Sequence, residues 1–200
     1  PWTDMEEALR QHQIPLYSLE TFTPLKEFDF VGFTLQYEMS YTNILNMLDL
    51  SGIPLLSKDR TDEDPLVIAG GPNAYNPEPL ADFIDLYYMG EGEVEYETLF
   101  KAYAEHKKQG GRRREFLKIA AQIPGMYVPS FYDVIYEDVP AQGCQYTPRI
   151  AAIRPNQPDV PEKVTKVLVE DMDALSYPTK PIIPYLQIVH DRAVMEIFRG

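Results

Sequence analysis

Three apolar runs, each followed by a turn or a helical pattern, limit most strongly what this chain can fold into. The runs are residues 29–35, 66–69 and 84–89. Runs that are apolar without alternation are typical of strands buried on both faces of a parallel sheet. The helical segments are residues 4–12, 40–50, 93–108 and 115–122. This alternation predicts an α/β fold over residues 1–123, with a parallel sheet and flanking helices.

The pattern changes after residue 123. Ten of the 18 prolines follow that point. They separate short β-rich runs at residues 126–128, 132–136, 146–153 and 164–169, which favours edge strands, hairpins and extended connections. Residues 124–181 are therefore predicted to form a β-rich linker or subdomain, and residues 182–200 contain two more strand candidates.

Charge and cysteine content exclude several classes of function. The net charge of −13 at pH 7 would repel DNA, RNA and anionic lipid, so neither nucleic acid nor a membrane is expected as a partner. Cys144 is the only cysteine, which excludes a disulfide within the chain and leaves no cysteine cluster for a metal. No apolar run has the length of a membrane span, and the first residues are no signal peptide. Because the chain has a single cysteine, a reducing, cytoplasmic location is expected. The basic run Arg112–Arg114 is interpreted as a solvated helix start.

Three loops follow strands of the predicted parallel sheet and therefore share one edge of it. Ligands of open α/β sheets bind at this carboxyl edge, and glycine there lets backbone amides approach a ligand closely. The candidate cofactor-binding residues are Thr34, Ser40, Gly70, Gly71, Pro72, Asn73, Gly90, Glu91 and Gly92. Each loop also has a structural interpretation: a tight turn at Gly70–Gly71, a helix cap at Glu91, and Ser40 as a helix N-cap.

No catalytic or metal-ligating residue can be assigned from the sequence. HExxH, Walker, GxSxG and GxGxxG motifs are all absent. The carboxylates are scattered, and no pair is placed for acid–base catalysis. His12 and His106 are interpreted as surface residues, and His190 as part of a polar turn.

The stretch Leu66–Glu93 contains GGP-x-A, then a Pro/Glu-rich loop and Gly-Glu-Gly-Glu. It resembles the cobalamin-binding-type domain found upstream of many radical-SAM cores, which implies an incomplete Rossmann-like parallel sheet over residues 1–123. Residues 125–132 resemble the linker of an uncharacterised branch of that family, and residues 188–200 resemble its first barrel strand. The resemblance implies a full-length Fe–S oxidoreductase with a [4Fe–4S] cluster and S-adenosylmethionine. It further implies that the chain is truncated just before the CxxxCxxC cysteines that hold the cluster.

The resemblance also assigns roles to the loops. Gly70 and Gly71 match glycines that lie against the corrinoid nucleotide tail, and Gly90–Gly92 match the second cofactor loop. Residues 34–40 match the loop that often supplies a hydroxyl. The DxHxxG motif, which would supply a histidine to cobalt, is absent, so we expect weak or absent cobalamin binding. The first strand of the family also lacks a counterpart, and we expect a second copy or a folded-back end to fill that position in the sheet.

Three functions remain open at this stage. The first is a cofactor-binding-like or regulatory domain of a radical-SAM enzyme, inactive alone and without a cofactor of its own. The alternative is a stand-alone Rossmann-like module that binds a nucleotide or another small molecule. The third is an acidic interaction domain whose glycine loops are only turns.

Overall fold

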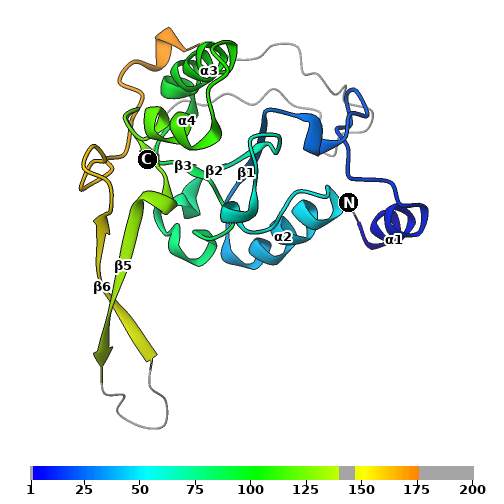
Figure 1. Cartoon of the computed structure of the whole chain (residues 1–200), viewed down its shortest axis with the longest axis horizontal. Coiled ribbons are helices and arrows are strands. Elements are labelled where there is room, and N and C mark those ends of the chain that lie inside the picture. The colour runs from blue at the N-terminus through cyan, green and yellow to red at the C-terminus, as the bar shows by residue number, and fades with distance from the viewer. Residues whose placement is uncertain (1, 140–146, 176–200) are drawn as a thin grey trace.

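A four-stranded sheet forms the centre of the chain in the computed structural model, which describes residues 2–139 and 147–175. The strand order is β1-β2-β3-β4 (Figure 1). The strands are β1 (Phe30–Thr34), β2 (Leu66–Gly70), β3 (Leu86–Tyr88) and β4 (Met126–Tyr127). The first three are parallel and β4 is antiparallel to β3. The expected α/β class with a mainly parallel sheet is therefore confirmed.

Helices cover both faces of the sheet. Between β1 and β2 the chain forms α2 (Tyr41–Leu50), and α1 (Thr3–His12) packs against it. After β3 it forms α3 (Gly92–Lys108) and α4 (Arg113–Ala120). Figure 1 shows α2 on one side of the sheet, with α3 and α4 on the other. No helix in the described part of the chain is long and apolar enough to cross a membrane.

The core explains why these segments adopt their structures. All five residues of β2 are buried, as expected for a strand with neighbours on both sides and helices on both faces. On the face of α2, Ile44 and Leu48 recur at helical spacing and are buried. On the other face, the Phe30 ring meets Tyr103 of α3 and Phe116 of α4 at centroid distances of 4.7 and 6.3 Å. The sheet thus has an aliphatic side and an aromatic side.

A local prediction differs from the structure. The sequence also predicts a short strand at residues 16–19, but the structure reduces it to a single bridge between Tyr17 and Pro24, because the chain turns tightly through Phe22 at φ 55°. The β2–β3 connection contains two 3-10 helices, Pro72–Tyr75 and Glu78–Leu80, each with a proline in its first turn. Strand β4, formed by residues that follow position 123, pairs with β3 in the central sheet. The remaining 3-10 helices are Leu25–Glu27, Glu38–Ser40, Ser57–Asp59, Pro129–Phe131 and Met172–Ala174.

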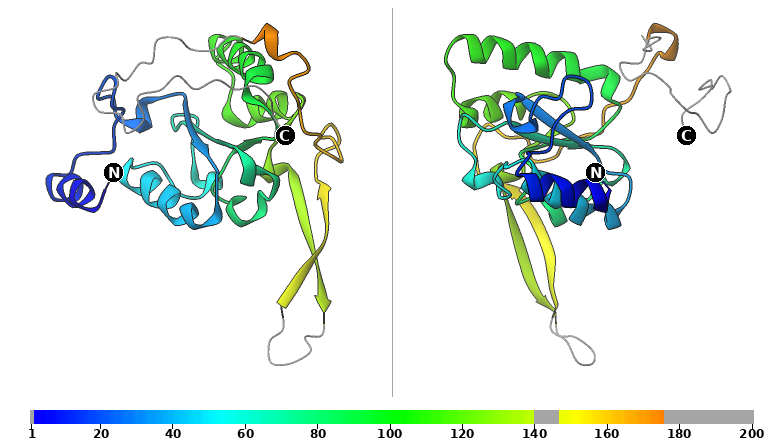
Figure 2. Two further views of the ribbon diagram at one scale, coloured as in Figure 1. Left: turned by 180° about the vertical axis from the view of Figure 1, so that it is seen from behind. Right: turned by 90° about the vertical axis from the view of Figure 1, so that its right-hand side faces the viewer.

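A two-stranded antiparallel ribbon projects from the sheet domain (Figures 1 and 2). We call residues 2–131 the sheet domain, and residues 132–139 together with 147–155 the ribbon. The ribbon consists of β5 (Tyr132–Val139) and β6 (Thr147–Pro155), with a bulge at Ile135/Tyr136. After it, the chain returns to the sheet domain, where Gly90 pairs with Val167.

Some predicted features lie outside the described residues. They are Cys144, the strand candidates within residues 182–200 and the polar turn at His190. The predicted domain boundaries and the predicted dimer remain predictions. No described strand pairs with the outer side of β1, which forms one edge of the described sheet.

Candidate functional site

The first two candidate loops meet at the carboxyl edge of the sheet, where the parallel strands end. Thr34 is the register partner of Gly70. Beyond them, the Leu35 amide donates a hydrogen bond to Gly70 O at 2.7 Å, and the Asn73 amide donates to Leu35 O at 2.9 Å. The structure therefore brings Thr34 together with the Gly70–Asn73 loop, as the parallel arrangement predicted.

Gly71 allows the loop after Thr34 and the Gly70–Asn73 loop to pack closely against each other. Its φ of 96° and ψ of −176° lie in a region that only glycine adopts readily. A Cβ placed there would lie 3.0 Å from both Leu35 O and Thr34 Cγ2. On the side where a Cβ would project, Gly71 is therefore packed against the end of β1.

The third candidate loop, at Gly90–Gly92, binds another part of the same chain. The Val167 amide donates to Met89 O at 3.1 Å, and the Glu91 amide donates to Val167 O at 3.0 Å. A Cβ on Gly90, whose φ is 149°, would lie 2.5 Å from Val167 O. Glycine at position 90 therefore permits a backbone pairing rather than an open cradle.

We call residues 164–169 the strap, because they cross the end of β3. The Val169 amide donates to Glu91 Oε2, so this predicted site carboxylate already accepts a strap hydrogen bond. A Cβ on Gly125 would lie 3.0 Å from Val167 Cγ2, so a second glycine makes room for the same side chain. Lys166 Nζ lies 5.9 Å from the centre of the Tyr75 ring, within the range of a cation–π contact. The strap is therefore held by backbone pairing, by a carboxylate and by glycine spacing together.

Tyr96 of α3 fills the space between the two glycine loops. A Cβ on Gly70 would lie 3.2 Å from its hydroxyl, and a Cβ on Gly92 would lie 2.8 Å from its ring. Burial raises the pKa of Tyr96. The Tyr88 hydroxyl donates to Glu91 O at 2.8 Å, and burial raises the pKa of Tyr88 to about 12. Sequence reasoning missed both tyrosines as site residues, since nothing in their spacing tells which loops they contact.

The remaining predicted residues have local roles or open positions. Thr34 and Pro72 are exposed. Ser40 precedes α2, but its hydroxyl donates to Tyr37 O at 2.8 Å and makes no helix-cap hydrogen bond. Asn73 Nδ2 is buried at this edge without a hydrogen-bond partner among the described residues, and so is the hydroxyl of Tyr41, the first residue of α2.

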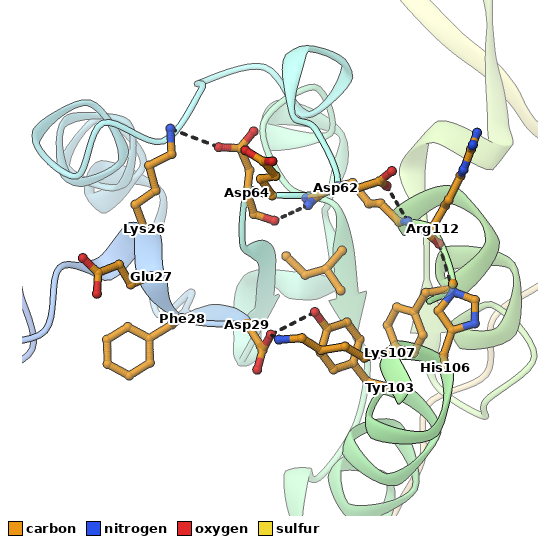
Figure 3. Close-up of a pocket in the computed structure, with 15 residues that line it drawn as sticks. Lys26, Glu27, Phe28, Asp29, Asp62, Asp64, Tyr103, His106, Lys107 and Arg112 are labelled. Atoms are coloured by element: carbon orange, nitrogen blue, oxygen red, sulfur yellow. Dashed lines mark hydrogen bonds and ion pairs between the residues drawn. The ribbon is translucent and has the colours of Figure 1, made fainter. Parts of the chain in front are cut away.

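The opposite, amino edge of the sheet carries a pocket of about 260 Å³ (Figure 3). An aspartate lies close before each parallel strand: Asp29 before β1, Asp64 before β2 and Asp85 before β3. Asp29 accepts a hydrogen bond from the Tyr103 hydroxyl at 3.1 Å and pairs with Lys107. The amino edge is thus a belt of charge pairs, in contrast to the glycine-rich carboxyl edge.

Asp85 is the centre of this belt. Its Oδ2 accepts hydrogen bonds from Arg60 Nη1 at 2.7 Å, the Val67 amide at 2.7 Å and Arg113 Nη2 at 2.5 Å. The side chains of Arg60 and Asp85 are 0% and 2% exposed. Burial lowers the pKa of Arg60, while the neighbouring Asp85 carboxylate opposes that shift. The interpretation of Arg112–Arg114 as a solvated helix start is wrong for Arg113, because its guanidinium reaches inward to this carboxylate.

Asp64 completes the belt. Its Oδ2 accepts hydrogen bonds from the Thr61 amide at 2.8 Å and the Thr61 hydroxyl at 3.0 Å, and its Oδ1 lies 3.3 Å from Lys26 Nζ. Burial tends to raise the pKa of Asp64, but these donors outweigh it and hold the pKa below its usual value. Each of the three strand-start aspartates is therefore bound by named donors, which indicates a structural role for this edge.

The described residues of this chain fit neither the [4Fe–4S] cluster nor the cobalamin of the resembled family. A [4Fe–4S] cluster needs three thiolates, and the whole sequence contains one cysteine. No group of three or more potential metal ligands occurs in the described residues. For cobalamin, both glycine loops are packed against the chain itself. The described histidines lie elsewhere: His12 ends α1, and His106 of α3 lines the pocket at the amino edge.

Comparison with known proteins gives two matches. The sequence model of the family described as "Radical SAM proteins, N-terminal" matches residues 1–129. An uncharacterized protein of Methanocaldococcus jannaschii is 33% identical over 85 residues, which are 41% of this chain and 17% of that relative. The match thus spans about one sixth of the relative's length. No solved structure matches the chain.

Proposed function

Because the chain belongs to the family of radical SAM protein N-terminal domains, we propose that it is the non-catalytic, regulatory N-terminal part of a radical-SAM enzyme. Its role in this proposal is to hold the segment that follows it at a fixed place. Reductive cleavage of S-adenosylmethionine by a [4Fe–4S] cluster would belong to the part of the protein that carries the cluster cysteines. The residues described here would contribute position rather than chemistry.

The strap is the observation that supports this role. A Cβ on Gly90 or on Gly125 would meet Val167, and the backbone of Met89–Glu91 pairs with Val167. Ligands of open α/β sheets bind at this edge, so the strap takes a position that such sheets commonly give to a ligand. A segment held there is restrained relative to the sheet, and a binding event that displaced it would change the position of the segment that follows.

Cluster content tests the assignment of chemistry. After anaerobic reconstitution with iron and sulfide, the 200-residue chain should hold no stoichiometric cluster, since it has one thiol. The full-length protein should bind a cluster and cleave S-adenosylmethionine. A cluster on the chain alone, or full-length protein that neither binds a cluster nor cleaves S-adenosylmethionine, would contradict the proposal.

Substitution of Gly90 tests the role of the strap. Gly90→Val should displace the strap, because even a Cβ meets Val167 O, and hydrogen exchange at residues 164–169 should rise by about tenfold. In the full-length protein the same change should alter the rate of S-adenosylmethionine cleavage at unchanged cluster content. Gly110→Val is the matched control, since Gly110 also has a positive φ but nothing within 4 Å of an added Cβ. Equal effects of the two variants would rule the role out.

A second function is favoured by one observation. Asn73 Nδ2 and the Tyr41 hydroxyl are buried polar groups of the first two loops without partners among the described residues, and such groups commonly meet a ligand or water. The corresponding function is a small-molecule binding module. It predicts that at least one of a panel of nucleotides raises the melting temperature of the chain saturably, and that Asn73→Leu abolishes the rise. If no member of the panel shifts the melting temperature, the small-molecule function is ruled out and only the strap-holding role remains.

A further inference from the structure

The ribbon has one apolar face that the described chain leaves largely in water. Val134 lies opposite Ile153, and Tyr136 lies opposite Ile150. Directly opposed residues of an antiparallel pair share a face. Tyr136, Ile150 and Ile153 are 58%, 41% and 38% exposed. A two-stranded ribbon is marginally stable by itself, so an exposed apolar face on one calls for a partner.

The bulge is what creates this face. Ile150 and Ile153 are separated by an odd number of positions and would point to opposite sides of a regular strand. The register shift between Ile135 and Tyr136 places one extra residue, Ala151, in β6. Both isoleucines therefore lie on the side of Val134 and Tyr136.

The other face is built for water. Asp133 lies opposite Arg154, and Glu137 lies opposite Arg149. Arg149 Nε is 3.7 Å from Glu137 Oε1, with the two side chains 75% and 50% exposed. Ile135 is the exception among these charges. Cross-strand charge pairs on one side and apolar pairs on the other make the ribbon amphipathic, so only one side is suited to a dry contact.

The base of the ribbon is anchored to the sheet domain. Phe131 is fully buried and the Tyr132 ring lies 4.7 Å from the Tyr127 ring of β4. The Asn156 amide donates to Phe131 O at 2.8 Å, and the Tyr132 hydroxyl donates to Pro161 O at 2.8 Å. Both strands are therefore tied down where they leave the domain, and the apolar face is presented in a set direction (Figure 2).

We infer that this apolar face docks on the radical-SAM core of the same polypeptide, an inference that rests on the proposed function. Four side chains are too few for stable association of separate molecules, which needs about 800 Å² on each partner, while one large aromatic side chain buries at most about 250 Å². A neighbour in the same chain is present at about millimolar effective concentration, so a small apolar contact suffices. The aligned residues make up only 17% of the relative, which leaves most of that protein available for such a contact.

Hydrogen exchange on two proteins tests the inference. Ribbon amides should exchange at least about tenfold more slowly in the full-length protein than in the 200-residue chain. Ile153→Lys should remove that protection. Ile135→Lys is a matched control on the charged face, since Ile135 and Ile153 are 39% and 38% exposed in the same ribbon, and it should leave the protection intact. Circular dichroism of both variants checks that the sheet domain stays folded.

Three outcomes would overturn the inference. One is equal exchange of the ribbon in the two proteins. Another is an equal effect of the two lysine variants. The third is protection in the 200-residue chain that rises with its concentration, together with a dimer by light scattering, which would assign the face to a second copy. Cluster content and S-adenosylmethionine cleavage are measured on the same full-length protein, so an exposed ribbon on an active enzyme would refute the docking and spare the proposed function.

Discussion

The sheet domain and the ribbon use the same kinds of interaction in opposite surroundings. In the sheet domain, Asp85 binds Arg60 with both side chains out of water, and the aromatic and aliphatic side chains pack on one another. In the ribbon, Glu137 and Arg149 pair in water, and Tyr136 and Ile150 are largely exposed. The comparison teaches that burial decides how much a contact contributes to stability. Water competes with an exposed charge pair, and an exposed apolar pair is only partly removed from water.

The largest effect should come from breaking the charge belt of the sheet domain. Asp85→Ala removes the carboxylate that neutralises the buried Arg60 guanidinium, which keeps only backbone carbonyls as acceptors, and it removes an acceptor from Arg113, so the free energy of unfolding should fall by about 3–5 kcal/mol. Urea denaturation followed by circular dichroism measures it. A loss below about 1 kcal/mol would mean that these arginines find water or other acceptors.

Substitution of a glycine at the carboxyl edge should have the second largest effect on stability. Gly71→Ala should destabilise the chain by about 3 kcal/mol, because the backbone conformation suits only glycine and the added Cβ meets the end of β1. Gly52→Ala should lose only about 1 kcal/mol, since Gly52 has a positive φ but open space around it. Equal losses in the two variants would show that contact between the two loops contributes nothing.

Alkaline pH should weaken the sheet domain through its tyrosines. Burial raises the pKa of Tyr88 and of Tyr103 to about 12. Unfolded tyrosine releases its proton near pH ~10, so the stability from these neutral phenols is complete below that pH and is lost as the pH rises toward ~12. Denaturation at a series of pH values, with tyrosinate absorbance as a second signal, tests this. Tyr88→Phe should make the decline shallower, and an unchanged slope would contradict the assignment.

The smallest effect is expected in the ribbon. Glu137→Gln should change the free energy of unfolding by less than about 0.5 kcal/mol, because the pair with Arg149 is long and exposed. The same urea denaturation measures it beside Asp85→Ala. If Glu137→Gln destabilised the chain nearly as much as Asp85→Ala, the pair of Glu137 with Arg149 would be buried in solution rather than exposed.

Much of the sheet domain could be predicted from local patterns. The apolar runs at β1, β2 and β3 and the helical spacing of α2 and α3 each lie within a few residues of the observed elements. Parallel strands end at a common edge, so the meeting of Thr34 with Gly70 and Gly71 followed from topology alone. The short strand predicted at residues 16–19 is wrong, because the turn through Phe22 allows only one bridge.

The sequence by itself determined the fold class, the glycine positions and the absence of a cluster site in this chain, because periodicity, backbone freedom and cysteine number are local or countable properties. Only the tertiary structure decided what the glycines face. Gly90 approaches Val167, which lies 77 positions away, and Arg113 at the start of α4 reaches Asp85 at the start of β3. Such pairings depend on how the whole chain closes around its core, and no short-range pattern encodes them. The physical reason is that a glycine only permits another segment to pack closely against the backbone, while the tertiary fold decides which segment packs there.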